Sequence, residues 1–448
     1  MSIEMEPSLC EIVEARFVDL LGRVKAMAMP LKSPSADPRE IAADPAVAAG
    51  ISVDGSSITG YAQVENSDLH LAPDPETVFL LPYHPGRAAV HCDLRQRGVK
   101  REYSPFALDP RGRLKAVLGE HLAAGQRFEI KPELEFYFVR ERRRRHSGSA
   151  AGKRPADAAG YVDVYPRDEL SHHMDRVYGS LNAMGIPAER VHHENGPGQV
   201  EVEVDYAPML AQADHLFAAK TAIQAIAYQE GLRATFMAKP FVDIAGSGMH
   251  IHLRLFAGDA NLFGAGSGEL TETGRQFTAG LLAHAPALTA VCNPTVNSYK
   301  RLVPGHEAPV QICWGYRNRS TLVRIPMFTD PAKASVEFRS PDATCNFYLA
   351  LAAIVAAGMD GVRRELEPPE ARTENIYALS AAQLRRLRIK PLPGDLGEAL
   401  NALERDEVVL GALGEQIAPR FLELHRAAWD EYLHGVVTDW EVKTYGDC

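Results

Sequence analysis

The sequence lacks the features that mark several large classes of protein. Its 448 residues include only six cysteines, and no two of them form a CxxC pair. Neither a zinc ribbon nor a disulfide framework is therefore indicated. No GxxxxGK[ST] P-loop occurs, and no glycine-rich dinucleotide fingerprint follows a strand-like segment. The longest apolar run, Phe347 to Met359, is too short to span a membrane and predicts a buried helix.

The charge balance also argues against polyanionic partners. The formal net charge is -10, which argues against nucleic acid or an anionic membrane as the main partner. Hydrophobic residues make up 46% and charged residues 24%, as is usual for globular proteins in water. The first ten residues, "MSIEMEPSLC", lack the charged and apolar regions of a signal peptide. We therefore expect a cytoplasmic protein with reduced thiols.

The length predicts more than one domain. Residues 10–100 contain short strand-like runs and turns, including a hairpin around Gly22 in "EARFVDLLGRVKAMAMP". Helical spacing begins in "SPFALDPRGRLKAVLGEHL", after a plausible cap. We place the boundary near residue 105, giving a domain of residues 1–105 and a larger one of residues 106–448.

Four strand-like segments of the larger domain alternate polar and apolar side chains. In "KPELEFYFV", Glu133 and Glu135 share one face, because successive side chains of a strand point to opposite faces. The other polar faces are those of "GQVEVEVDY" (Glu201, Glu203, Asp205), "MHIHLRLF" (His250, His252, Arg254) and "SVEFRSPD" (Glu337, Arg339), with Glu194 at a turn in "VHHENGPGQ".

One polar strand face usually meets solvent. Four such faces, rich in Glu, His and Arg, favour a sheet that surrounds a ligand. Buried carboxylates must be paired, protonated or bound to metal. Glutamate and histidine without cysteine suit Mg²⁺ or Mn²⁺ better than structural zinc. These residues alone indicate a metal-dependent phosphoryl or nucleotidyl enzyme, and a two-metal phosphohydrolase remains an alternative.

Specific motifs occur in order along nearly the whole chain: "FVDLLGRVK", "DGSSITGY", "ENSDLHLAPD", "PELEFYF", "HHENGPGQVEVE", "GLRATFMAKP", "GSGMHIH", "NPTVNSYKRLVPGHEAP", "NRSTLVRIP" and "VEFRSPD". In these motifs the chain resembles the bacterial type I glutamine synthetases. The resemblance implies an α+β fold, with a small N-terminal β-grasp domain and a large catalytic domain whose curved antiparallel sheet is flanked by helices. It also implies a dodecamer of two hexameric rings, with active sites at subunit interfaces.

The activity implied by the resemblance is ATP-dependent ligation of ammonia to the γ-carboxylate of L-glutamate, through γ-glutamyl phosphate. ATP would be the co-substrate, with two or more Mg²⁺ or Mn²⁺ ions per site. The resemblance assigns one ion to Glu135, Glu194 and Glu201, and a second ion to Glu133, His250 and Glu337. Glu133 and Glu135 could then lie side by side because each faces a cation.

Further roles are carried over by position. Those implied for catalysis fall on Asp54, Tyr161, Glu307 and Arg319. Those implied for substrate binding fall on Ser57, Gly246, Arg301 and Arg339. Those implied for the nucleotide fall on Glu189, His252 and Arg324, and we add Arg254. Asp54 would act at the active site of a neighbouring subunit, and Glu307 would close over the intermediate.

Three positions depart from the family pattern. Ala245 replaces an Asn beside the glutamate site, Arg254 stands where Ser is usual, and Ser335 stands where Arg is usual. We hypothesise that Arg254 substitutes for the charge missing at residue 335. These departures keep two rivals open: a γ-glutamyl-amide synthetase that uses an organic amine, and a non-catalytic relative, which the presence of all six metal ligands disfavours.

Overall fold

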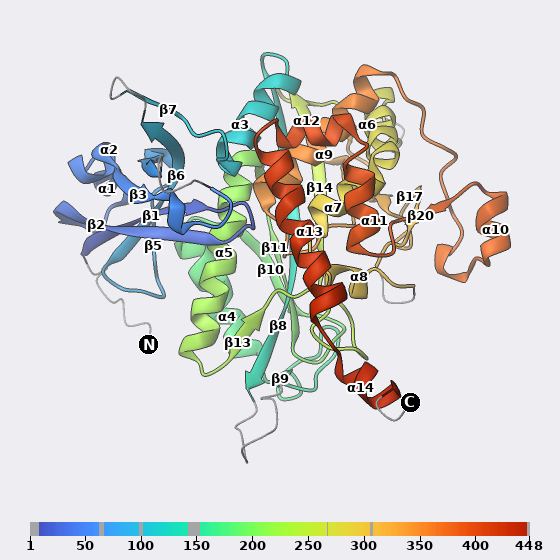
Figure 1. The fold of residues 1–448 in the computed structure, drawn as a ribbon, viewed down its shortest axis with the longest axis horizontal. Coiled ribbons are helices and arrows are strands. Elements are labelled where there is room, and N and C mark those ends of the chain that lie inside the picture. Colours follow the sequence, from blue (N-terminus) through green and yellow to red (C-terminus); the bar gives the residue numbers. More distant parts are fainter. Residues whose placement is uncertain are drawn as a thin grey trace.

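The computed structural model describes residues 9–61, 67–97, 102–141, 153–266, 268–304 and 308–445. It contains a small sheet with short helices at the N-terminal end, followed by a larger sheet with helices around it (Figure 1). The composition is α+β, as expected from the sequence. No helix in these ranges is long and apolar enough to cross a membrane.

The N-terminal sheet has seven strands in the described part of the chain, with the central order β2-β1-β6-β4-β3 and with β5 and β7 paired to β6. Its strands are β1 (Cys10–Val18), β2 (Val24–Ser35), β3 (Ile51–Asp54), β4 (Asp68–Pro73), β5 (Phe79–Leu80), β6 (Arg87–Arg97) and β7 (Tyr103–Pro105). The predicted hairpin is confirmed: β1 and β2 pair antiparallel, and Gly22 takes a positive φ in the turn. Two short helices, α1 (Pro38–Ala42) and α2 (Pro45–Ala49), follow β2.

The larger sheet has eleven described strands, with the central order β10-β11-β8-β14-β19-β18-β17. Its strands are β8 (Gln126–Glu141), β9 (Lys153–Pro155), β10 (Ala188–His193), β11 (Gln199–Val204), β12 (Ala207–Pro208), β13 (Arg233–Thr235), β14 (Met249–Ala257), β15 (Ala260–Asn261), β17 (Trp314–Tyr316), β18 (Val323–Ile325) and β19 (Val336–Phe338). A separate pair joins β16 (Gln311–Ile312) to β20 (Lys390–Pro391).

Helices surround the larger sheet (Figure 1). They are α3 (Pro110–His121), α4 (Ser171–Ala183), α5 (Met209–Gln229), α6 (Glu272–Ala283), α7 (Ala285–Cys292), α8 (Ser298–Arg301), α9 (Phe347–Arg363), α10 (Ala381–Arg386), α11 (Leu396–Leu403), α12 (Glu407–Leu413), α13 (Ile417–Gly435) and α14 (Asp439–Tyr445). The predicted buried helix is α9, capped by Asn346, whose side chain accepts from the backbone N–H of Leu349.

Two expectations need correction. The larger sheet is not wholly antiparallel, because the three-residue strands β17 and β18 pair in parallel. The polar and small residues of segment 140–160 also predict one exposed loop. Lys153–Pro155 instead forms β9, which extends the sheet by pairing with the end of β8. Alternation across so short a segment is too weak a signal to predict pairing.

One arginine on α3 connects the two sheets. The guanidinium of Arg111 lies 2.8 Å from Asp74 and 2.6 Å from Asp93, both in the N-terminal sheet region. It also lies 2.8 Å from Asp214 on α5. Tyr348 on α9 donates to the same Asp214 at 2.5 Å. Arg111 is 3% exposed, so this network fixes the N-terminal sheet against the helices of the larger domain.

Candidate active site

Strand register places polar residues of neighbouring strands side by side on one face of the sheet. Across β11, β8 and β14, Glu203 pairs with Glu133, which in turn pairs with His250. One row away, Glu201 on β11 pairs with Glu135 on β8. Side chains of directly paired residues share a face of the sheet. Glu337 on β19 pairs with His252 on β14. The four polar segments found in the sequence are therefore neighbours in one sheet.

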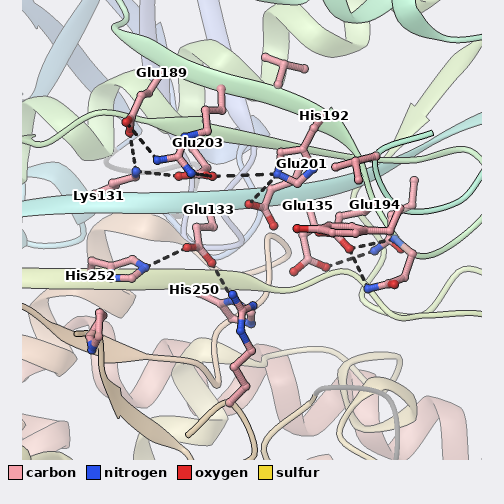
Figure 2. A pocket seen from close by; sticks show the side chains of 18 of the residues that line it. Lys131, Glu133, Glu135, Glu189, His192, Glu194, Glu201, Glu203, His250 and His252 are labelled. Carbon is pink, nitrogen blue, oxygen red and sulfur yellow. Dashed lines mark hydrogen bonds and ion pairs between the residues drawn. The ribbon is translucent and has the colours of Figure 1, made fainter. Parts of the chain in front are cut away.

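The polar face of these strands forms the floor of a cavity of about 1200 Å³. Figure 2 shows the carboxylates of Glu133, Glu135 and Glu201 on neighbouring strands within it. The residues predicted to act here that line the cavity are Glu133, Glu135, Tyr161, Glu189, Glu194, Glu201, Gly246, His250, His252, Arg254, Arg301, Arg319 and Arg324.

The first cluster joins Glu133, His250 and Glu337, whose potential ligand atoms all lie within 4.8 Å of one another. The Glu133 carboxylate lies 2.9 Å from His250 Nδ1 and 2.9 Å from His252 Nε2 (Figure 2). Burial raises the pKa of Glu133, but the hydrogen bonds from the two histidines outweigh it and hold the pKa well below its usual range. Burial lowers the pKa of His250 to about 4. A carboxylate and a neutral imidazole are the forms that bind a divalent cation.

The second cluster joins His192, Glu194 and Glu201. Glu135 lies beside it: burial, reinforced by Glu201, raises the pKa of Glu135 to about 8. Burial also raises the pKa of Glu201 to about 7. The Glu135 carboxylate accepts from the backbone N–H of Gly248 at 2.8 Å. These acids crowd one another, and a bound cation would relieve the repulsion.

Four of the predicted arginines lie at or near the cavity and differ in how deeply they are buried. Arg324 and Arg339 pair with Glu337 from two sides, at 2.9 and 2.5 Å. Arg339 is fully buried and lies behind Glu337, without lining the cavity. Arg301 on α8 does line it, held by a bond of its guanidinium to the carbonyl of Ser340 at 2.7 Å. Arg319 lines the cavity from an exposed position.

A group of charged side chains lies on the side of the cavity away from Glu194 (Figure 2). Lys131 Nζ lies 2.5 Å from Glu189 and 2.6 Å from Glu203 (Figure 2). The guanidinium carbon of Arg254 lies 3.5 Å from the centre of the Tyr206 ring. Lys131 and Arg254 both line the cavity, and positive groups of this kind suit a polyphosphate.

The remaining predicted residues lie apart or outside the description. Tyr161 is 56% exposed, and the edge of its ring meets His192 at the cavity wall. Asp54 and Ser57 are exposed in the N-terminal domain and do not line this cavity. Hydrogen bonds from Ser56, Ser67 and Ser57 lower the pKa of Asp54 to about 2. Glu307 lies outside the described residues.

Comparison with known proteins is decisive for the family. Residues 10–96 match the glutamine synthetase β-grasp domain, and residues 107–445 match the glutamine synthetase catalytic domain. The chain belongs to the glutamine synthetase family. It is an enzyme of the class of ligases that form C–N bonds, and members of this family use ATP and divalent metals.

Two glutamine synthetases match this chain over almost the whole length of both sequences. A glutamine synthetase of Methanocaldococcus jannaschii is 41% identical, with 97% of this chain and 95% of the relative covered. One of Halobacterium salinarum is 41% identical, with 99% and 95% covered. A solved structure of GmaS in complex with ADP is 34% identical, covers 98% of this chain and 97% of that one, and superposes with a TM-score of 0.83.

Three side chains that line the cavity had no role assigned to them from the sequence. His192 stands beside Glu201, and its hydrogen bond to that carboxylate raises its pKa to about 9. Lys131 and Glu203 form an ion pair on the cavity floor. Lys131 and Glu203 lie on polar strand segments already identified by alternation, although no role was assigned to them. His192 lies on β10, which the sequence analysis did not identify as a polar strand.

Proposed function

We propose that the protein joins ammonia to the γ-carboxylate of L-glutamate with ATP, through γ-glutamyl phosphate. The observation that supports this most is the presence of two ligand clusters at one cavity: Glu133 and His250, which line it beside the buried Glu337, and Glu194 with Glu201, which also line it. Nucleotide phosphates and an amino-acid carboxylate need such adjacent sites to react.

The donor set fits two divalent ions. Glu135, Glu194 and Glu201 would hold one ion, and Glu133, His250 and Glu337 the other. Carboxylate oxygens and a single imidazole suit Mg²⁺ or Mn²⁺. When bound, the ions would neutralise charge on the phosphates and align them with the glutamyl carboxylate.

Arginines would hold the two substrates. Arg301 is buried at the cavity wall, next to Gly246, where a side chain would collide with the Arg301 stem. We assign both residues to the glutamate end. Arg319, Arg324 and Arg254 would face the nucleotide, with Glu189 and His252 nearby. Arg339 would act mainly through Glu337, which it holds ionised: burial raises the pKa of Glu337, but His252, Arg339 and Arg324 together lower it.

Asp54 of a neighbouring subunit and Tyr161 would form the ammonium site. The low pKa of Asp54 keeps its carboxylate ionised, which suits attraction of an ammonium ion. Asp54 would take a proton from the ammonium ion, and the exposed nitrogen lone pair would attack the acyl phosphate and expel inorganic phosphate. Glu307 would help exclude water, since hydrolysis of the intermediate competes with amide formation.

An organic amine is the alternative nucleophile. Two structural neighbours are GmaS, a γ-glutamylmethylamide synthetase, and Ala245 stands beside Gly246 where the family pattern has Asn. Tyr137 donates to the Ala245 carbonyl at 2.7 Å and so fixes this backbone. The relatives with higher identity are glutamine synthetases, which favours ammonia.

A phosphate-release assay tests the nucleophile. Ammonia, methylamine, ethanolamine and a polyamine are each supplied with glutamate, ATP and Mg²⁺, and the product is identified by mass spectrometry. We expect ammonia to give the highest kcat/KM and the product to be glutamine. A higher kcat/KM for an amine would reject the proposal in favour of the alternative. A Glu133→Gln variant serves as the background control.

We also propose a cytoplasmic dodecamer of two hexameric rings. The segment of residues 433–442, from the end of α13 into α14, exposes the apolar side chains of Leu433, Val436, Val437, Trp440 and Val442. Exposed apolar surface of this kind favours contact with another protein copy. The five described cysteines are free and buried, as in a reducing compartment.

A further inference from the structure

A third cluster of potential metal ligands lies behind the cavity. It joins Asp157, which follows β9, Asp168, which precedes α4, and His193, the last residue of β10. One potential ligand atom of each lies within 4.8 Å of the others. The side chains of His193 and Asp157 are 0% exposed, and Asp168 is 3% exposed. None of the three lines the cavity.

The ring of His193 is oriented as in metal sites. Its Nδ1 lies 2.8 Å from the carbonyl oxygen of Glu194, so Nδ1 carries a proton and donates it. The other nitrogen, Nε2, faces Asp157 Oδ1 at 3.1 Å. Histidines that bind a metal through one nitrogen usually donate the other N–H to a carbonyl or carboxylate.

The Asp157 carboxylate is incompletely satisfied. Its Oδ1 accepts from the backbone N–H of Gly198 at 2.7 Å, while Oδ2 is buried and has no hydrogen-bond partner. Within the ranges that the structure describes, no Lys or Arg forms an ion pair with Asp157 or Asp168. Of the described residues, the only basic side chain paired with these two buried carboxylates is therefore His193, and they require either a second proton on its ring or a cation.

We propose that His193, Asp157 and Asp168 bind a divalent cation such as Mn²⁺ or Zn²⁺. One imidazole and two carboxylates are ligands that both ions accept. The competing occupant is a second proton on His193, which would make the ring an imidazolium between the carboxylates. This site is separate from the two clusters of the cavity and does not depend on the proposed reaction.

The cation would connect segments that carry predicted active-site residues. Glu194 follows His193 directly, and the backbone N–H of Val162, next to Tyr161, donates to the His193 carbonyl at 3.0 Å. Filling the site would therefore fix both Tyr161 and Glu194 from behind. The role is positional, since no member of the cluster reaches the cavity.

Manganese counting tests the site. Protein stripped with a chelator is titrated with Mn²⁺, and bound ions are counted from the loss of the free Mn²⁺ electron paramagnetic resonance signal. We expect Asp168→Asn to bind one ion fewer per subunit than the wild type. Asp163→Asn, in the same loop but paired with Arg167, is the matched control and should bind the wild-type number. Equal counts in all three proteins would overturn the proposal.

A second measurement requires no variant. Wild-type crystals soaked in Mn²⁺ are examined by anomalous diffraction, and a peak is expected between His193 Nε2 and the two carboxylates. The Glu133→Gln variant should keep this peak, even where it loses one in the cavity, which separates this site from the proposed reaction. The lack of a peak among these side chains would show that only a proton occupies the site.

Discussion

At the scale of single residues, Glu135 and Glu201 are acids whose ionisation the fold opposes. Their pKa values are raised to about 8 and about 7, chiefly by burial, from the usual value of 4.5. The folded chain thus keeps protons that the unfolded chain has lost. The stability contributed by these groups is present below about pH 4.5 and is lost as the pH rises to about 8.

We predict that the protons held by Glu135 and Glu201 make the affinity for metal ions depend on pH. A cation can bind only after the protons leave, so Mn²⁺ affinity should rise with pH up to about pH 8 and then level off. For each proton displaced, the gain is about tenfold per pH unit. Isothermal titration with Mn²⁺ between about pH 6 and about pH 9 measures it. An affinity that does not change with pH would contradict the raised pKa values.

A second prediction at this scale concerns Arg254. Its guanidinium stacks on Tyr206, and its Nε is buried without a hydrogen-bond partner. If Arg254 binds phosphate, Arg254→Ala should raise the KM for ATP about tenfold, a loss of about 1.4 kcal/mol, with a smaller change in kcat.

The matched control is Arg127→Ala. Arg127 also stacks on an aromatic ring, that of Phe256 at 4.7 Å, but it does not line the cavity. Its loss should leave the KM for ATP unchanged. An unchanged KM in the Arg254 variant as well would reject the hypothesis.

Alternation in the sequence predicted which residues of the central strands share the cavity face, but not Glu189 or Glu194, which came from the resemblance and from a turn. Glu133, Glu135 and His250 lie on the faces that a period of two assigns to them. Asp157 and Asp168 could not be found this way, because they lie in a loop without periodicity. Their proximity to His193 depends on how that loop packs, which local sequence does not encode.

At the scale of elements, Arg111 on α3 joins two parts of the fold. It pairs with Asp74, Asp93 and Asp214, and its loss would leave Asp214 buried without its cation. We predict that Arg111→Ala lowers the free energy of unfolding by about 3–5 kcal/mol. Thermal and urea unfolding measure the loss.

Arg420→Ala is the control for Arg111. Arg420 pairs with Glu423 on the surface of α13, where both side chains are exposed. Its loss should cost at most about 1 kcal/mol. Equal losses in the two variants would show that the Arg111 network does not stabilise the junction of the sheets.

Element types were predicted better than their pairing. The hairpin at Gly22 and helix α9 were evident from turn and apolar patterns. The order β11-β8-β14-β19 was not, because strands far apart in sequence meet through packing of the whole domain. The boundary at residue 105 stays a prediction.

At the scale of the whole molecule, the proposed site needs residues from two subunits. Asp54 does not line the cavity of its own chain, whereas Glu133 does. We predict that Asp54→Ala and Glu133→Gln are each inactive alone. Equal amounts, unfolded and reassembled together, should recover about one quarter of wild-type activity, because about one site in four receives both intact residues.

Intersubunit complementation is measured by phosphate release from the mixed assembly. Mixing the assembled variants without exchange of subunits is the control and should give no activity. No recovery in co-assembled particles would place Asp54 and Glu133 at the same subunit's site. Wild-type activity of the Asp54→Ala variant alone would remove Asp54 from the reaction.

The central claim is that this cavity activates glutamate as an acyl phosphate. Glutamate labelled with oxygen-18 in its γ-carboxylate tests it most directly. The account predicts that one labelled oxygen passes to the inorganic phosphate for each amide formed, since the carboxylate oxygen attacks the terminal phosphoryl group of ATP. Phosphate without label, or label found in AMP, would contradict it.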